Sequence, residues 1–414
     1  MRHLSLLFID PIISDIFYIV NNFSNIFCDF FSKLHVFHSD TSFSFCYTID
    51  IASRMCIIES GDANARKIFS RLCNERRLPS SGSHGSDMKK AKILVVGSMN
   101  MDLITSGDRF VKSGETIYGT AFSTAPGGKG ANQAIQAARL SADVTMVGKI
   151  GNDAFGRELL KSANDSGVDT SNVIVDKNIP TGIADIQLCK TESGTLNRII
   201  IVPGANGAIT VDDVSFLKER IKEYDMVILQ HEIPQEINVA LAGYAARAGV
   251  VVMLNPAPAA KIPDALMKNL TYISPNEHEA AELTGICAGS EDDLGKIISA
   301  FSALGVKNTL ITLGKAGAVL GNGEEYLRCF SVDYRPVVDP TAAGDSFIAA
   351  FCVARSVGLA KADSLYFASV VAAVTVSRMG AQPSLPTLDE ALSALSEVCG
   401  DKETESRILS AFGR

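Results

Sequence analysis

The sequence has little of what marks several large protein classes. Its 38 lysines and arginines are outnumbered by 46 aspartates and glutamates, which gives a net charge of −8. Proteins that bind a nucleic-acid backbone normally carry a basic excess, so we expect no nucleic-acid partner. The uncharged run at residues 16–28 is shorter than the roughly 20 residues that cross a bilayer, and Asp10 interrupts the apolar run that begins at Leu4. We therefore expect neither a membrane anchor nor a secretory signal, but a cytoplasmic protein.

Metal-binding and redox patterns are also scarce. The nine cysteines contain no C-x-x-C pair and stand at no zinc-ligand spacing from a histidine, so they are interpreted as reduced thiols. Only His231 and His278 follow His84. This scarcity argues against a histidine triad or a multi-histidine metal centre.

The chain changes composition near residue 88. Nine of the 20 phenylalanines lie in the first 47 residues, where no helix or strand period emerges, and residues 80–86 have the glycine and serine content of a linker. We interpret residues 1–87 as an extension without a catalytic role, with a regulatory or targeting arm as the alternative. The catalytic domain is expected to occupy residues 88–414.

Short apolar runs then alternate with amphipathic stretches. Strands are predicted at residues 93–96, 144–150, 226–229, 250–254, 271–273 and 309–313, with helices between them, among them one at residues 214–222. This alternation predicts an α/β fold: a doubly wound, mostly parallel sheet flanked by helices in three layers. Polar and apolar residues alternate within residues 103–125 and 180–202, which predicts a small β-sheet lid. The alanine-rich residues 344–377 predict two packed helices.

Polar side chains follow the first predicted strand. Asn100 and Asp102 are two residues apart, so in an extended segment they share a face. A carboxylate that accepts from hydroxyls beside an amide that donates and accepts suits a polyol ligand. The alternative is that Asp102 only forms a turn or caps a helix.

A glycine-rich stretch, residues 127–132, precedes a predicted helix. Its glycines allow close approach of the backbone to a ligand. It is not a Walker A loop, because Ser123 and Gly130 stand where that motif needs a glycine and a hydroxyl residue. The alternative is a glycine turn without a ligand.

The most informative stretch is residues 339–345. Its small residues place the backbone N–H groups of Ala342, Ala343 and Gly344 at a helix N-terminus, where they can form an anion hole for a phosphoryl group. Asp345, in the first turn, can accept the proton of an attacking hydroxyl. The alternative is that Asp345 only interacts favourably with the helix dipole.

Nine short motifs together resemble the ribokinase family of carbohydrate kinases over residues 92–392. They lie at residues 97–102, 127–133, 202–206, 229–234, 254–258, 275–279, 312–314, 341–345 and 380–384. The resemblance implies a kinase that moves the γ-phosphoryl group of ATP to the primary hydroxyl of D-ribose, with Asp345 as the base and the 5-phosphate as product. It also implies a homodimer through the lid.

The resemblance also implies residue roles. The sugar would be held by Asn100, Asp102, Gly128, Lys129, Asn132 and Glu232. ATP would be bound by Asn276, Thr312, Gly314, Gly317, Gly344 and Ser369, with Glu279 near Mg²⁺. A monovalent cation, usually potassium, would be held by Asp339, Thr341, Thr375, Arg378, Gly380 and Ser384, several through backbone oxygens. Pro340 departs from the family pattern and removes one N–H from this loop.

Two alternative functions remain at this point. One is a sibling kinase for deoxyribose, another sugar or a nucleoside, which would share the anion hole but differ in the lid and the sugar loop. The other is a non-catalytic sugar-binding regulator, which would be expected to have lost Asp345 or the small residues before it. Both features are present.

Overall fold

The computed structural model describes residues 90–191 and 194–414, so the predicted extension, residues 1–87, lies outside the described residues. The main sheet has nine strands in the order β13-β12-β11-β10-β9-β8-β1-β4-β5. All neighbouring strands run parallel except β12 and β13, which are antiparallel to their neighbours. The strands are β1 (Lys92–Val96), β4 (Asp143–Gly151), β5 (Asp169–Asp176), β8 (Met226–Gln230), β9 (Val251–Asn255), β10 (Tyr272–Ile273), β11 (Asn308–Thr312), β12 (Ala318–Gly321) and β13 (Tyr326–Cys329). The predicted α/β fold is confirmed.

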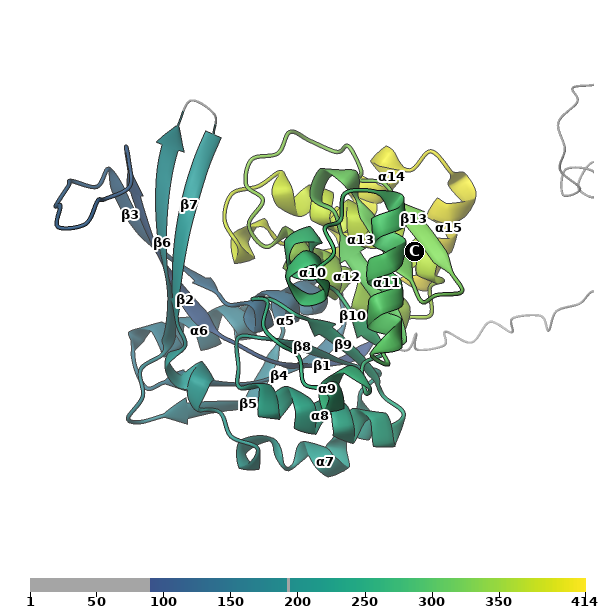
Figure 1. The fold of residues 1–414 in the computed structure, drawn as a ribbon, viewed down its shortest axis with the longest axis horizontal. Coiled ribbons are helices and arrows are strands. Elements are labelled where there is room, and N and C mark those ends of the chain that lie inside the picture. Colours follow the sequence, from purple (N-terminus) through teal and green to yellow (C-terminus); the bar gives the residue numbers. More distant parts are fainter. Residues whose placement is uncertain (1–89, 192–193) are drawn as a thin grey trace, which may run out of the picture. The chain divides into compact units, whose positions relative to one another are not determined.

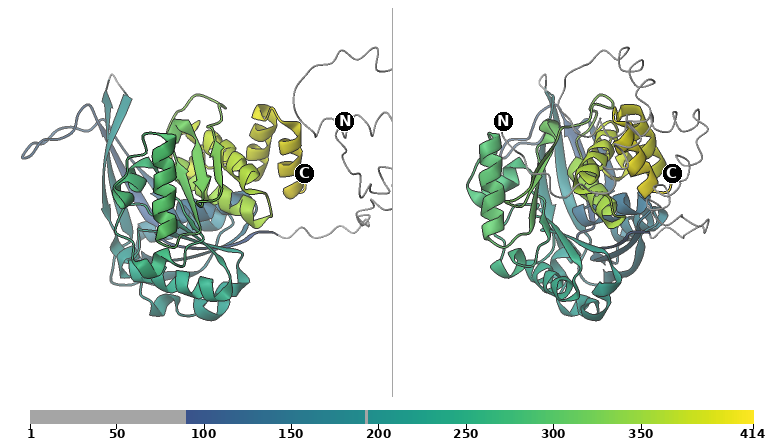
Figure 2. Two further views of the ribbon diagram at one scale, coloured as in Figure 1. Left: turned by 45° about the vertical axis from the view of Figure 1, so that its right-hand side comes forward. Right: turned by 90° about the vertical axis from the view of Figure 1, so that its right-hand side faces the viewer.

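Helices cover both faces of this sheet (Figures 1 and 2). Alternate residues of β1 show why: Ile93 and Val95 belong to one apolar core, whereas Leu94 and Val96 belong to the other. The first core includes α5 (Lys129–Arg139), α6 (Ala154–Asp165), α12 (Ala343–Ser356), α13 (Lys361–Val376), α14 (Leu388–Val398) and α15 (Lys402–Ala411). The second includes α7 (Leu217–Arg220), α8 (Gln235–Ala248), α9 (Asp264–Met267), α10 (Glu277–Thr284) and α11 (Glu291–Ala303).

The predicted lid is a second sheet of four strands in the order β3-β2-β6-β7. These are β2 (Asn100–Gly107), β3 (Ala121–Gly127), β6 (Gly182–Thr191) and β7 (Gly194–Val202), and the sheet projects from the body of the domain (Figure 1). β2 begins at Asn100, earlier than the predicted boundary. Asn100 pairs with Gly127 of β3 and Gly182 of β6, so two of the predicted sugar residues, Asn100 and Asp102, stand inside the lid sheet.

One predicted helix is wrong. Residues 214–222 form a single short α-helical turn between two 3₁₀ segments. The backbone N–H groups of Ser215 and Lys218 donate to carbonyls three residues earlier, at 3.2 and 3.0 Å. Val214 and Leu217 are buried three residues apart, a spacing that suits a 3₁₀ turn as well as an α-helix, so periodicity could not separate the two.

Two further predictions concern the cysteines and the membrane. Among the described residues, Cys287, Cys329, Cys352 and Cys399 are free thiols, and Cys189, Cys352 and Cys399 are buried. None of the helices described here has the length and apolar character needed to cross a membrane.

Candidate active site

The segment after β1 places polar side chains around Glu232. Ser98 Oγ donates to Glu232 Oε2, and Asn100 Nδ2 donates to the same oxygen at 3.4 Å. The backbone N–H of Lys129 donates to it at 3.1 Å. Asn206 Nδ2 donates to Asn100 Oδ1 at 2.8 Å and fixes that amide from the other side. The structure thus brings together the predicted sugar residues Asn100, Lys129 and Glu232.

Asp102 lies next to this cluster because glycines leave room for it. A Cβ on Gly127 would lie 2.5 Å from Asp102 Oδ2, and a Cβ on Gly128, whose φ is +89°, would lie 2.7 Å from the Asn100 nitrogen. Burial, together with the negative charges of Glu232 and Asp345, raises the pKa of Asp102 to about 7. These carboxyl groups therefore crowd one small region.

Lys129 is the cation that balances this negative charge. Burial acts to lower its pKa, but the carboxylates of Asp345, Glu232 and Glu279 outweigh it and raise the pKa of the ammonium group. Burial also raises the pKa of Glu232 and of Glu279, against the opposing effect of Lys129. Three carboxylates around one ammonium leave an excess of negative charge, which suits a further cation.

Asp345 occupies the first turn of α12, as predicted, and it faces α5. Asn132 Nδ2 donates to Asp345 Oδ2 at 3.0 Å, and Gln133 Nε2 donates to Oδ1 at 2.9 Å. The buried Oδ1 of Asn132 has no hydrogen-bond partner within the described residues. An unpartnered buried acceptor is costly, so it marks a place where a ligand hydroxyl would be favourable.

The helix start beside Asp345 differs in one respect from the expected anion hole. Ala343 donates its N–H to the Pro340 carbonyl at 3.2 Å, so that amide is already occupied. A Cβ on Gly344 would meet no atom of the part of the chain described here within 4 Å, and Gly344 is exposed. Ala342 has a φ of +60°, a strained conformation for a residue with a side chain. The open space therefore lies in front of Gly344.

Four of the predicted ATP residues, Asn276, Thr312, Gly314 and Gly317, lie at or just after the ends of β10 and β11, while Ser369 lies in the middle of α13. Asn276 and Thr312 form a parallel bridge, and Thr312 donates its N–H to the Pro275 carbonyl at 3.1 Å. Gly314 and Gly317 both have positive φ in the turn that follows. Ser369 Oγ lies 3.4 Å from the Sγ of Cys329 on β13.

Glu279 has a local structural role as well as the predicted one near Mg²⁺. Its Oε2 accepts from the N–H of Asn276 at 2.9 Å, while Asn276 Oδ1 accepts from the N–H of Glu279, and the two form the capping box of α10. The described residues contain no group of three or more histidine, cysteine, aspartate or glutamate side chains suited to hold a metal ion by themselves. A divalent ion here would need ligands from a bound phosphate.

The predicted monovalent-cation residues converge only in part. Asp339 accepts from the N–H of Thr341 at 2.9 Å and from the N–H of Gly380 at 2.9 Å, which ties the loop before α12 to the loop after α13. Ser384 lies buried just beyond, with its hydroxyl donating to the Ala381 carbonyl at 2.7 Å. These contacts leave backbone carbonyls and carboxylate lone pairs as the groups that could ligate a cation.

Two residues of the predicted cation set direct their side chains elsewhere. The Thr375 hydroxyl donates to the Val371 carbonyl of its own helix at 2.9 Å, and Arg378 pairs with Glu390 at 2.8 Å. Any contribution of Thr375 and Arg378 to a cation site would therefore come from their backbone.

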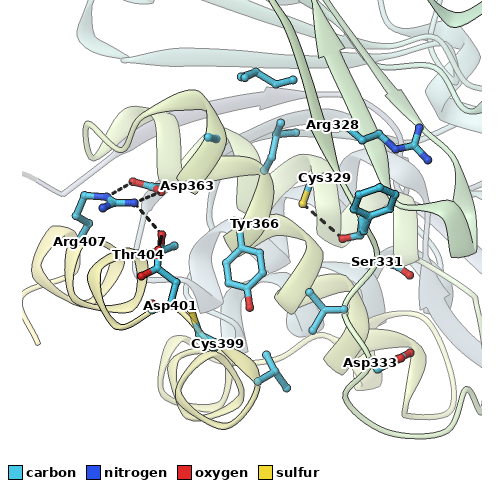
Figure 3. Close-up of a pocket in the computed structure, with 17 residues that line it drawn as sticks. Arg328, Cys329, Ser331, Asp333, Asp363, Tyr366, Cys399, Asp401, Thr404 and Arg407 are labelled. Atoms are coloured by element: carbon cyan, nitrogen blue, oxygen red, sulfur yellow. Dashed lines mark hydrogen bonds and ion pairs between the residues drawn. The ribbon is translucent and has the colours of Figure 1, made fainter. Parts of the chain in front are cut away.

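A cavity of about 740 Å³ lies beyond Ser369 rather than at Asp345. Figure 3 shows Tyr366 in its middle, the Arg407–Asp363 ion pair on one side, and Cys329 on the other. Because Cys329 contacts Ser369, the cavity borders the predicted nucleotide residues and not the sugar residues. Neither Asp345 nor any predicted sugar residue lines this cavity, so the cavity is separate from the place where we expect the chemistry.

The structure adds residues to which no role was assigned from sequence. Gln133, Asn206, Gln230 and Asn255 are buried: Asn206 donates to Asn100, while Gln133, Gln230 and Asn255 connect Asp345 to the ends of β8 and β9. All four stand inside the nine motifs, and Gln230 and Asn255 directly follow two predicted strands, at residues 226–229 and 250–254. That position at the carboxyl end of a strand was the available signal.

Comparisons with known proteins agree with this geometry. Residues 90–388 match the model of the pfkB family carbohydrate kinases. The chain is 39% identical over 310 residues to a ribokinase of Lactococcus lactis, covering 74% of this chain and 98% of the relative. It is 41% identical over 310 residues to a ribokinase of Schizosaccharomyces pombe, covering 72% and 96%.

A solved structure is similar over the same region. The Arabidopsis thaliana ribokinase in complex with ribose and ATP superposes with a TM-score of 0.69 at 36% identity, and the match covers 74% of this chain and 99% of that one. The similarity therefore spans the whole of the relative's fold.

Proposed function

Because the chain belongs to the pfkB family of carbohydrate kinases, we propose that it transfers the γ-phosphoryl group of ATP to the primary hydroxyl of D-ribose. The products are ADP and D-ribose 5-phosphate. The ribokinases of Lactococcus lactis and Schizosaccharomyces pombe support this choice of acceptor, as does the ribose and ATP complex of the Arabidopsis thaliana ribokinase. The observation that carries the proposal is the buried carboxylate of Asp345, which lies beside the open helix start at Gly344 and beside the unpartnered oxygen of Asn132.

The sugar residues suit a polyol. Asp102 and Glu232 offer carboxylate acceptors, and Asn100 and Asn132 offer amides. Gly128, which has no side chain, allows the backbone to lie close to the sugar. The Lys129 ammonium can donate to a hydroxyl and offset the surrounding negative charge. Ribose carries one more hydroxyl than deoxyribose, so it would form more hydrogen bonds with these groups.

Asp345 then acts as the base. The primary hydroxyl oxygen forms a bond to the γ-phosphorus as the bond to the β,γ-bridging oxygen breaks, the hydroxyl proton passes to Asp345, and ADP leaves. The Gly344 amide, with Ala342 and Ala343 shaping the loop, would stabilise the charge that develops on the phosphoryl group, and the open space around Gly344 supports this role. Asn276, Thr312, Gly314, Gly317 and Ser369 would line the nucleotide.

Two cations belong to this proposal. Mg²⁺ would accompany ATP near Glu279, where it would neutralise phosphate charge, and the excess of carboxylates in that region fits it. A monovalent cation, potassium being the first candidate, would sit between the loops joined by the contact of Asp339 with Gly380, with Thr341 and Ser384 nearby and Thr375 and Arg378 contributing backbone oxygens.

A homodimer through the lid in the cytoplasm completes the proposal. β7 is an edge strand of the lid sheet, and Leu196, Ile199 and Ile200 on it are 51%, 52% and 60% exposed. An exposed apolar edge strand favours pairing with another copy. Analytical ultracentrifugation should therefore show a dimer, and charged substitutions at Ile199 and Ile200 should shift it toward monomer.

The test of the function is ADP release by the full chain with ribose, deoxyribose, fructose or adenosine, each in potassium or sodium. We expect kcat/KM to be at least about tenfold higher for ribose than for any other acceptor, and phosphorus NMR should show the 5-phosphate. A ribose preference of less than tenfold would favour the sibling kinase, and no turnover with any acceptor would favour the sugar-binding regulator.

A further inference from the structure

The carboxylate of Asp345 is held by two neighbouring amides of α5 that have different surroundings. Asn132 donates to one oxygen, and its own carbonyl oxygen has no partner among the described residues, so it can also reach a ligand. Gln133 donates to the other oxygen, is 0% exposed, and has both ends of its amide bonded to protein groups. Gln133 therefore cannot contact a substrate, and any effect it has on the reaction must pass through Asp345.

The rest of the Gln133 amide is bound at the carboxyl ends of the central strands. Gln230 Nε2, at the end of β8, donates to Gln133 Oε1 at 2.7 Å. Gln133 Nε2 also lies 3.2 Å from Asn255 Oδ1, at the end of β9, and Asn255 in turn donates to the Ser274 carbonyl at 3.1 Å. The Asp345 carboxylate thus connects through one amide to two strands of the main sheet.

The chemistry of the groups determines which atoms donate and which accept in these hydrogen bonds. An ionised carboxylate can only accept, so the nitrogen of Gln133 must face Asp345 and its oxygen must face Gln230. A donor in that position makes a charge-assisted hydrogen bond to the carboxylate and holds its plane against rotation. Because every member is buried, each bond is stronger than it would be in water.

We infer that Gln133 is a positioning residue for the catalytic base: its amide, braced by Gln230 and Asn255, orients the Asp345 carboxylate toward the attacking hydroxyl. The inference rests on the proposed function, because it needs Asp345 to be the base. A purely structural role, in which Gln133 only joins α5 to the strand ends, would lower stability without changing the reaction. The two roles therefore differ in what substitution does to kcat and to its pH dependence.

The test compares Gln133→Met with Gln136→Met in the full chain, with ribose and ATP. Both glutamines are 0% exposed on α5, but Gln136 donates to the Pro386 carbonyl at 3.0 Å and does not touch Asp345. Gln133→Met should lower kcat at neutral pH about tenfold or more, since it removes a hydrogen bond to a charged group. It should also move the acidic limb of the pH profile of kcat to higher pH and change the KM for ribose less than about threefold.

The control should behave differently. Gln136→Met should lower the thermal midpoint and leave the acidic limb in place. If Gln133→Met keeps kcat within threefold of the wild type with an unmoved limb, the inference is overturned. If instead the wild-type chain does not phosphorylate ribose at all, that result contradicts the proposed function itself and not only the role of Gln133.

A second variant keeps the test decisive if Gln133→Met does not fold. Gln230→Met leaves the Gln133 donor in place but removes the bond that holds its far end. It should shift the acidic limb in the same direction by a smaller amount. A limb that does not move in a folded Gln230→Met protein would then count against the inference.

Discussion

The two sides of the candidate site are built differently. The sugar side, formed by Asn100, Asp102, Asn132 and Asp345, is buried, and its carboxylates and amides are held by one another and by the strand ends. The nucleotide side, formed by Asn276, Thr312, Gly314, Gly317 and Gly344, is half-buried or exposed and makes mostly local contacts, and only Ser369 of the predicted ATP residues is buried. The fold therefore preorganises the sugar side, whereas the nucleotide side leaves its polar groups open to a ligand.

Glycine substitutions give the largest expected contrast between the two sides. In Gly127→Ala the new methyl group would lie 2.5 Å from the Asp102 carboxylate and must displace it. We expect kcat/KM for ribose to fall roughly 100-fold, because a displacement of about 1 Å in a positioned group has an effect of that size. Overpacking should also cost about 1–3 kcal/mol in unfolding free energy, measured in urea. An unchanged kcat/KM would show that the sugar side is not preorganised.

Gly344→Ala should affect activity without affecting stability, because its methyl group would meet no atom of residues 90–191 or 194–414 within 4 Å. The methyl group would instead enter the space proposed for the phosphoryl group, so we expect kcat/KM for ATP to fall about tenfold. Gly295→Ala in α11, which also has nothing within 4 Å, is the matched control and should keep full activity. A loss of stability in Gly344→Ala alone would contradict the open nucleotide side.

The pH dependence of the two KM values should differ as well. The pKa of Asp102 is raised to about 7, so below that pH the carboxyl group is protonated and loses its capacity to accept from two hydroxyls. The KM for ribose should rise up to about tenfold per pH unit below 7, while the KM for ATP changes little. Asp102→Asn should flatten this dependence. A KM for ribose that stays constant from pH 8 to pH 5.5 would contradict it.

The same raised pKa has a consequence for the unliganded protein. Between the ordinary value of 3.8 and about 7, the folded protein holds a proton on Asp102 that the unfolded chain has released. The contribution of this group to stability is therefore fully present below pH 3.8 and is lost as the pH rises through 7. Ribose, which would bind the ionised form, should restore part of the lost stability at pH 8, measured as a higher thermal midpoint.

Sequence reasoning reached the fold because buried parallel strands leave continuous apolar runs, as in residues 93–96 and 226–229. Asn100 and Asp345 could be predicted from the sequence as candidate site residues, because each is a polar residue at a boundary between predicted elements. Sequence reasoning did not reach the role of Gln133, because that role depends on how the ends of β8 and β9 lie beside α5. Nor could it show that Pro340 accepts the N–H of Ala343, which depends on the turn geometry of one loop.

The roles of Asp345 as base or as a partner of the helix dipole are separated most directly by one pair of variants. Asp345 and Asp363 are both buried acids in the first turn of a helix, 7% and 6% exposed, but Asp363 pairs with Arg407 at 2.8 Å. Measured by ADP release with ribose, Asp345→Asn should lower kcat about 1,000-fold with an unaltered circular dichroism spectrum, while Asp363→Asn should lose stability and keep kcat. If Asp345→Asn retains near-normal turnover, Asp345 is not the base.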